Sequence, residues 1–197
     1  MLDYEKRFYS DTIKYISGSD EAGRGPLAGP LVAASVILPQ GYYHEKIRDS
    51  KKLSEKVREE MYDVIIKNAV AYSIIIYDAP KIDRLNVHLA NRLIIEESIN
   101  TLKVKPELAL IDAFNLKELD IPSIPIIKGD DRSLCIAAAS ILAKVTRDRI
   151  MVEIDRIYPG FGFKDHKGYY NDVHIKALDE FGPIKGIHRF SYKPIKK

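Results

Sequence analysis

Cysteine is scarce in this sequence, and histidine is not spaced for a metal site. The 197 residues include one cysteine, Cys135, and five histidines, none of which falls at a metal-ligand spacing. A single cysteine cannot form an internal disulfide, and inside an apolar run it is expected to be a small core residue in a reducing compartment. Without a cysteine pair or a histidine pair, the sequence excludes a zinc site.

Charge of one sign and long apolar runs are also lacking. The formal net charge is only +3, so any affinity for nucleic acid must come from local patches. The longest uncharged stretch, residues 25–43, is interrupted by Gly29, Pro30 and Pro39, which excludes a membrane span. The first residues are too charged for a signal peptide, so we expect a soluble cytoplasmic protein. With 46% hydrophobic and 30% charged residues, the chain is expected to fold as one domain around a core.

The common nucleotide-binding loops are missing as well. Gly23, Gly25 and Gly29 follow the spacing G-x-G-x-x-x-G, which is one residue too long for a dinucleotide-binding loop. Two acids directly before them, Asp20 and Glu21, would repel a pyrophosphate in the absence of a metal. A Walker A lysine is absent too. Both nucleotide-binding interpretations are therefore discarded.

The most informative stretch runs over residues 19–30. The adjacent carboxylates of Asp20 and Glu21 lead into Gly-Arg-Gly directly after an apolar run. Like charges disfavour joint ionisation, and a divalent cation is the usual resolution at a functional site. The glycines allow backbone N–H groups to approach a ligand closely. The stretch therefore predicts a metal-dependent phosphodiester site.

Hydrophobic periodicity predicts a mixed α/β protein. Residues 1–14 are interpreted as a polar lead-in with at most one helical turn, and residues 159–168 as a loop. Small residues in the first half of the helix that follows Ser133 would let it lie close to a sheet. The order of elements favours a mixed sheet. Strands are predicted at 15–20, 31–38, 70–77, 108–111 and 124–127, and helices at 56–67, 82–102, 133–158 and 171–181.

Three carboxylates fall at the ends of predicted strands. Asp20 ends the first strand, Asp112 ends a later one, and Asp130 lies at a strand-to-helix junction. Ligands in open α/β sheets gather at the carboxyl ends of strands, so these side chains are expected to meet there. Hard oxygen ligands suit Mg²⁺ or Mn²⁺. Other acids, namely Asp131, Asp148 and Asp155, are interpreted as caps or surface charges.

Glu21 poses a geometric problem, because successive strand residues point to opposite faces of a sheet. We expect the strand to bend between Asp20 and Glu21, since the glycines begin immediately afterwards. The alternative is that one of the two offers its main-chain carbonyl as well as, or instead of, its side chain.

Three further segments could contact a polyanion. Lys51 and Lys52 precede a helix capped by Ser54, where they either hold phosphates or merely begin an ordinary helix. The loop with Lys167 and Tyr169 combines a cation, a glycine and an aromatic ring, which could stack on a sugar–base unit or pack within the protein. The chain then ends in a basic tail, which is either a phosphate-binding surface or a solvated terminus: Lys185, Arg189, Lys193, Lys196 and Lys197.

Taken in order, these motifs resemble ribonuclease HII, the type 2 ribonuclease H family, from about Ser17 to Phe190. The resemblance rests on Asp-Glu-Ala-Gly-Arg-Gly-Pro-Leu-Ala-Gly-Pro at 20–30 and Asp-Ser-Lys-Lys-Leu-Ser at 49–54. It continues with Gly-Asp at 129–130, Ile-Ala-Ala-Ala-Ser-Ile-Leu-Ala-Lys-Val-Thr-Arg-Asp at 136–148, and His-Lys-Gly-Tyr at 166–169. Asp131 departs from the pattern, since the family more often has a small residue there.

The resemblance implies an RNase H-like fold, in which helices flank a five-stranded mixed sheet and a C-terminal helical extension follows. The catalytic domain would span residues 1–158, and the basic, substrate-contacting extension residues 159–197. The catalytic and metal-binding acids would be Asp20, Glu21, Asp112 and Asp130. The substrate-binding residues would be Gly23, Arg24, Gly25, Lys51, Lys52, Lys167 and Tyr169.

The implied activity is that of a monomeric endoribonuclease with two divalent ions, Mg²⁺ or Mn²⁺. It would cut RNA–DNA hybrids and DNA with embedded ribonucleotides on the 5′ side of a ribonucleotide, and leave 3′-hydroxyl and 5′-phosphate ends. Two rival functions stay open on the residues alone. One is a non-catalytic hybrid-binding protein, and the other is a metal-dependent phosphatase for small substrates.

Overall fold

The sheet at the centre of the protein has five strands and is mixed. The computed structural model describes residues 3–116 and 119–195. In the strand order β3-β2-β1-β4-β5, the pairs β1–β2 and β2–β3 are antiparallel, whereas β1–β4 and β4–β5 are parallel. This arrangement confirms the predicted mixed sheet. The strands are β1 (Ile16–Ala22), β2 (Leu31–Ile37), β3 (Ala71–Tyr77), β4 (Leu108–Asp112) and β5 (Ser123–Ile126).

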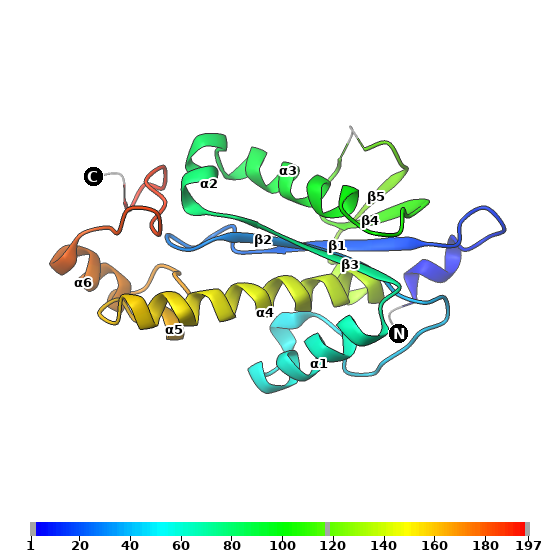
Figure 1. Ribbon diagram of the computed structural model, residues 1–197, viewed down its shortest axis with the longest axis horizontal. Helices are drawn as coiled ribbons and strands as arrows, with labels where there is room; N and C mark the ends of the chain where they lie inside the picture. Colours follow the sequence, from blue (N-terminus) through cyan, green and yellow to red (C-terminus); the bar gives the residue numbers. More distant parts are fainter. Residues whose placement is uncertain (1–2, 117–118, 196–197) are drawn as a thin grey trace.

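Helices cover both faces of the sheet. Figure 1 shows α2 and α3 on one side and α1 and α4 on the other, with α5 and α6 at one end. None of the helices within the described ranges is both long and apolar enough to cross a membrane. The α-helices are α1 (Glu55–Asn68), α2 (Ala79–Leu85), α3 (Val87–Asn100), α4 (Leu134–Ile157), α5 (Phe163–His166) and α6 (Asp172–Phe181). Short 3₁₀ helices are η1 (Tyr4–Arg7), η2 (Ser50–Lys52) and η3 (Gly129–Asp131).

Side-chain caps set several of these helix boundaries. Ser54 accepts a hydrogen bond from the Val57 N–H at the start of α1, as its position predicts. The single helix expected over 82–102 is wrong, because Asn86 divides it into α2 and α3. Asn86 has φ +62°, and its side chain accepts hydrogen bonds from the N–H groups of His88 and Leu89. Asparagine tolerates this left-handed backbone, so a new helix begins here instead of the old one continuing.

The bend expected between Asp20 and Glu21 is also wrong. Strand β1 pairs with β2 in unbroken register through Ala22, with Asp20 opposite Ala34 and Glu21 opposite Ala33. Ala34 belongs to the core under α1 and α4, whereas Ala33 belongs to the core under α3. Because the strand stays regular, the side chains of Asp20 and Glu21 point to opposite faces of the sheet.

Helix α4 lies along β1 and β2 on one of these faces. Its first half contains several small residues that are fully buried, including Ala137, Ala138, Ala139 and Ala143. Cys135 is buried in the same core, as expected. Small side chains let the helix axis approach the sheet closely, and this packing fixes α4 relative to the acids on β1 and β4.

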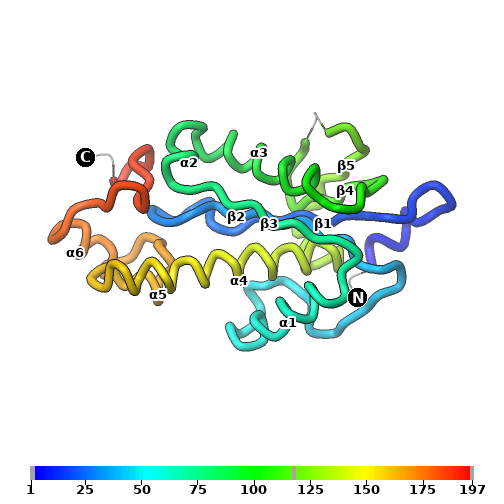
Figure 2. Tube along the Cα trace, in the orientation of Figure 1, coloured from blue at the N-terminus to red at the C-terminus, as the bar shows by residue number. Residues whose placement is uncertain are grey.

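The C-terminal segment folds back onto the turn between β1 and β2. Figure 2 shows the orange-to-red end of the chain beside the blue β1–β2 connection. The Gly29 N–H donates to the Ile187 carbonyl at 2.8 Å, and the Arg189 N–H donates to the Leu27 carbonyl at 2.9 Å. The Leu27 N–H in turn donates to the Gly168 carbonyl at 2.9 Å. Segments far apart in the chain therefore meet at the carboxyl end of β1.

Candidate active site

Asp20 and Asp112 lie next to each other on neighbouring parallel strands. Strands β1 and β4 pair in parallel up to Ser19 opposite Ile111, so the next pair of residues along the two strands is Asp20 and Asp112. Adjacent strands are about 4.8 Å apart, and paired residues share a face. Both carboxylates therefore point toward α4 at the same sheet edge. Burial raises the pKa of Asp20 well above its usual value, and the charges of Glu21 and Asp112 raise it further.

Glu21 reaches the same edge from the opposite face. Its Oε1 lies 3.7 Å from Nη1 of Arg24. The pKa of Glu21 is raised overall. Burial is the largest cause and the charge of Asp112 adds to it, whereas the Arg24 guanidinium and the Asn91 amide on α3 act in the opposite direction. Because Asp112 influences both Asp20 and Glu21, the two faces share one electrostatic environment at this edge.

Asp130 is held close to Asp112 by the turn in which it lies. The preceding residue, Gly129, donates its backbone N–H to Asp112 Oδ1 at 2.7 Å. A Cβ on Gly129 would lie 2.5 Å from Ile136 Cδ1 and 3.3 Å from Asp112 Oδ1, so a larger residue would disturb this contact. Burial raises the pKa of Asp130, and the charges of Asp49 and Asp112 add to the effect. The turn thus links a third acid to the pair on β1 and β4.

The ammonium group of Lys51 faces this cluster of acids. Lys51 Nζ lies 3.7 Å from Asp130 Oδ2. Burial by itself lowers the pKa of Lys51, but nearby carboxylates raise it overall. These carboxylates belong to Asp130, Asp20, Asp49 and Asp112. The ammonium therefore lies in the combined field of acids from four different segments, although most of the Lys51 side chain is exposed.

Asp49 is an acid that was not predicted as a site residue from sequence. Within the part of the chain that the structure describes, ligand atoms of Asp49, Asp130 and Asp131 all lie within 4.8 Å of one another, which is close enough to share a metal ion. Asp131, interpreted from sequence as a cap or a surface charge, belongs to this group. Lys52 forms ion pairs with Asp131 and, at 3.8 Å, with Asp49. The sequence signal that could have identified Asp49 is its position directly before Ser50 and Lys51.

The loop between β1 and β2 is held from inside by two buried arginines. Arg147 on α4 donates from Nε to the Pro30 carbonyl at 2.9 Å, and from Nη2 to the carbonyls of Ala28 and Lys167. Burial lowers the pKa of Arg147 to about 10, and the nearby Arg189 contributes to the decrease. These contacts join α4, the glycine-rich loop and the segment before Tyr169.

Arg189 is the second of these arginines, and its assignment to an exposed basic tail is wrong. Its side chain is fully buried and donates to the carbonyls of Gly23 at 2.7 Å and Arg24 at 3.1 Å. It also donates to the carbonyls of Gly29 and Pro30. The position of Arg189 near the C-terminus indicated an exposed residue, but the chain returns to the core after α6. Of the remaining tail residues, Lys196 and Lys197 lie outside the described residues.

Tyr169 faces the glycine loop across an open hollow. A Cβ on Gly25 would lie 3.6 Å from Tyr169 Cε1, and the Arg147 guanidinium lies 5.8 Å from the centre of the tyrosine ring. The hollow has a volume of about 410 Å³. It brings together seven of the predicted site residues, namely Asp20, Glu21, Gly23, Arg24, Gly25, Lys51 and Tyr169, and it is also lined by Ala22, Ser50, Ser140, Lys144 and Arg147.

Four predicted residues lie outside the lining of this hollow. Asp112 and Asp130 are connected to it through the contacts described above. Lys52 is engaged with Asp49 and Asp131. The Lys167 ammonium donates to the Lys164 carbonyl, and its own carbonyl accepts from Arg147 at 2.9 Å. Lys52 and Lys167 therefore lie beside the hollow and are bound to other parts of the protein.

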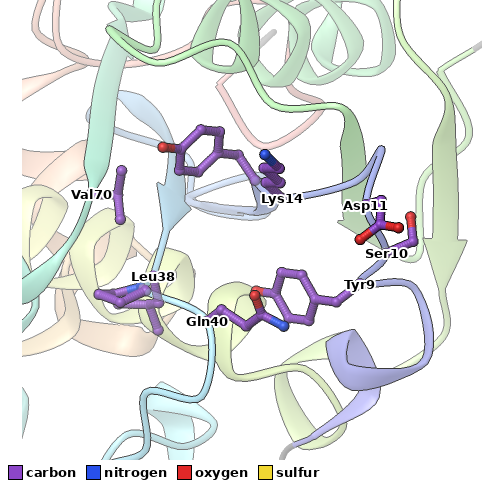
Figure 3. A pocket seen from close by; sticks show the side chains of 9 residues that line it. Tyr9, Ser10, Asp11, Lys14, Leu38, Gln40 and Val70 are labelled. Carbon is purple, nitrogen blue, oxygen red and sulfur yellow. The ribbon is translucent and has the colours of Figure 1, made fainter.

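A larger hollow of about 610 Å³ lies at the amino end of β1 (Figure 3). Among the residues that the structure describes, its lining includes one carboxylate, that of Asp11, and none of the predicted site residues. The carboxylates therefore favour the smaller hollow, at the carboxyl end of β1, as the candidate active site. The lining of the larger one is Tyr9, Ser10, Asp11, Lys14, Tyr15, Leu38, Pro39, Gln40 and Val70.

The acids at the carboxyl end of β1 suit a hard divalent cation. The ligand set consists of carboxylate oxygens, as Mg²⁺ and Mn²⁺ prefer. The pKa of Asp20 is raised by burial and by neighbouring acids, and the Glu21 N–H, which donates at 2.7 Å, only partly offsets this. A cation would relieve the repulsion, so the residues fit a divalent metal site.

Comparison with known proteins gives a consistent result. The family model of ribonuclease HII matches residues 17–195. The chain is 55% identical over 186 residues to a ribonuclease HII of Mycoplasma mycoides subsp. mycoides SC, covering 94% of this chain and 89% of that one. It is 48% identical over 196 residues to a ribonuclease HII of Acholeplasma laidlawii, covering 100% and 96%. Among solved structures, the ribonuclease H2 of Pyrococcus horikoshii OT3 superposes with a TM-score of 0.79 at 25% identity, covering 92% and 95%.

Proposed function

The chain belongs to the ribonuclease HII family, and we propose that Asp20, Glu21, Asp112 and Asp130 form its catalytic centre. The RNase H-like fold with its five-stranded mixed sheet is shared with the solved relatives. The protein is a metal-dependent endoribonuclease, which cleaves RNA in RNA–DNA hybrids and excises ribonucleotides from DNA. We propose the identity of its four catalytic acids, its substrate-binding residues and the position of the phosphodiester bond that it cleaves.

The observation that carries this proposal is the meeting of three acids from distant segments. Asp20 and Asp112 are neighbours across β1 and β4, and the hydrogen bond from Gly129 ties the turn of Asp130 to Asp112. Two bound Mg²⁺ or Mn²⁺ ions would supply an activated water and stabilise the leaving oxygen. Asp20, Asp112 and Asp130 would hold them from the α4 face. Glu21 would contribute from the strand edge through its side chain or its main-chain carbonyl.

The groups around the hollow account for recognition of the substrate. Arg147 and Arg189 draw the loop carbonyls inward, and this supports a role for the N–H groups of Gly23 to Gly25 as donors to the substrate. These amides and the Tyr169 hydroxyl would sense the ribose 2′-hydroxyl, which distinguishes RNA from DNA. Arg24, Lys51, Lys52, Lys167 and the segment 159–197 would hold backbone phosphates without reading bases.

Cleavage of a defined duplex tests this function. The substrate is an end-labelled DNA duplex with one embedded ribonucleotide, incubated with and without Mg²⁺, beside an all-DNA duplex of the same sequence. We expect one Mg²⁺-dependent cut on the 5′ side of the ribonucleotide, with 3′-hydroxyl and 5′-phosphate ends, and no cut in the all-DNA control. Binding without cleavage would favour a hybrid-binding protein. Hydrolysis of small phosphate esters that long duplex does not inhibit would favour a phosphatase.

A further inference from the structure

Two histidines of the C-terminal segment form a buried pair beneath Tyr169. His174 on α6 and His188 are almost completely buried, and their Nε2 atoms lie 3.0 Å apart. Around them pack the aromatic rings of Phe161 and Phe163, and His166 is stacked on His174 with ring centres 4.8 Å apart. Neither histidine belongs to the carboxylate cluster or lines the hollow described above.

The neighbours of the pair determine where each ring carries its proton. His174 Nδ1 lies 2.9 Å from the Tyr169 carbonyl, which can only accept, so Nδ1 must donate. His188 Nδ1 accepts from the Ile184 backbone N–H at 2.8 Å, so this nitrogen carries no proton. For two neutral rings, the contact between the Nε2 atoms then has one direction, in which His188 donates to His174. Burial, the largest cause, lowers the pKa of both histidines, consistent with neutral rings.

The hydrogen bonds thus run in a single chain from Ile184 through His188 and His174 to the Tyr169 carbonyl. We propose that His174 and His188 are positioning residues that hold the Tyr169 backbone and thereby set its ring opposite Gly25. This inference rests on the proposed function, because it takes the Tyr169 side chain as a substrate contact. It assigns no direct contact with the substrate to either histidine.

His188 also connects Tyr169 to the opposite wall of the hollow. Its backbone pairs with Ala28 in the glycine-rich loop, and the adjacent Arg189 holds the carbonyls of Gly23 and Arg24. The same short segment therefore fixes both walls, one through its backbone and Arg189 and the other through the histidine pair. Loss of the pair is expected to change the distance between Tyr169 and the loop while the carboxylates stay in place.

Nitrogen-15 NMR of the unaltered protein tests the proton arrangement directly. At neutral pH, long-range ¹H–¹⁵N spectra of histidine-labelled protein should show His174 protonated on Nδ1 and His188 protonated on Nε2. Both rings in the same tautomer, or either ring charged, would overturn the proposal. This measurement needs no variant, so it stands even if a substitution in the pair prevents folding.

Paired substitutions at His174 test the effect on catalysis. Asparagine can still donate from Nδ2 toward the Tyr169 carbonyl, whereas leucine cannot. For a duplex with one ribonucleotide, we expect His174→Leu to raise KM about tenfold with little change in kcat, and His174→Asn to recover most of this loss. His88→Leu, at an exposed position on α3, is the matched control and should behave as the unaltered protein. Equal KM values for the leucine and asparagine variants would overturn the positioning role.

A parallel Tyr169→Ala variant separates this inference from the function on which it rests. If Tyr169→Ala impairs cleavage and His174→Leu does not, the positioning role is wrong and the proposed function stands. If Tyr169→Ala has no effect while Mg²⁺-dependent cleavage persists, Tyr169 is not a substrate contact and the inference fails with it. Absence of cleavage by the unaltered protein would contradict the proposed function itself, whatever the tautomers prove to be.

Discussion

The backbone N–H of Gly129 donates a 2.7 Å hydrogen bond to Asp112 Oδ1, and this bond joins the end of β4 to the turn that carries Asp130. Residue 129 also lies against Ile136 near the start of α4. The relative placement of two of the four proposed catalytic acids thus depends on one backbone amide and on the absence of a side chain at its residue.

Substitution of Gly129 by alanine should impair catalysis more than folding. The added Cβ would crowd Asp112 Oδ1 at 3.3 Å and press on the flexible end of Ile136 at 2.5 Å. We expect kcat to fall at least about tenfold, because the Asp112 carboxylate must move, while stability falls by only about 1 kcal/mol. Single-turnover cleavage and urea unfolding measure the two effects. Normal cleavage by a folded variant would show that this contact does not position Asp112.

The two glycines that flank Arg24 should respond differently to alanine. At Gly25 a Cβ meets only Tyr169 Cε1, at an ordinary contact distance of 3.6 Å, so Gly25→Ala should fold normally. It would nevertheless fill space between the loop and Tyr169, and kcat/KM for a duplex with one ribonucleotide should fall about tenfold or more. At Gly23, with φ +101°, a Cβ would lie 2.3 Å from Arg147 Nε, so Gly23→Ala should lower the melting temperature. Equal stability losses in the two variants would contradict this division.

Replacement of Arg189 by lysine should destabilise the protein although the charge is retained. The planar guanidinium donates to the carbonyls of Gly23, Arg24, Gly29 and Pro30, and a lysine ammonium cannot reproduce this geometry. Buried carbonyls would lose their donors, so we expect a loss of about 3 kcal/mol in urea unfolding. Arg156→Lys, at an exposed ion pair with Glu153, is the control and should change stability by less than about 0.5 kcal/mol. Similar losses of stability at both positions would argue against a stabilising role of the buried Arg189 guanidinium.

Acidification should destabilise the fold through His188. Burial and the neighbouring His174 lower the pKa of His188 from 6.5 to about 4. Between these two pKa values the His188 ring is protonated in the unfolded chain and neutral in the folded chain. Stability therefore falls as the pH drops from about 6.5 toward 4. The loss attributable to His188 should reach about 2 kcal/mol near pH 5. Urea unfolding across this range should show a shallower dependence for His188→Gln, and identical slopes for both proteins would contradict the assignment.

Much of the fold could be predicted from sequence, because local signals state it directly. Apolar runs marked the strands, and Ser54 marked the start of α1 at the observed cap. The break at Asn86 was missed, because the apolar periodicity continues across it and only the conformation of that residue reveals the interruption. The bend expected after Asp20 is absent for a related reason, since the pairing with β2 keeps β1 regular through Ala22.

The site could be predicted only where chain position implied spatial position. Asp20 lies near the carboxyl end of β1 and Asp112 ends the neighbouring parallel strand β4, so their meeting followed from strand order. Arg189 could not be identified in this way. In a basic segment near the C-terminus it resembles a solvated residue, and only the return of the chain onto the β1–β2 loop makes it a buried donor. The His174–His188 pair likewise depends on tertiary packing that spacing does not reveal.

Anomalous diffraction from crystals containing Mn²⁺ and a duplex with one ribonucleotide tests the central claim most directly. We expect anomalous peaks coordinated by carboxylate oxygens of Asp20, Asp112 and Asp130, on the α4 face at the carboxyl end of β1. Manganese bound only between Asp49 and Asp131, with Asp20 and Asp112 free of metal, would contradict it.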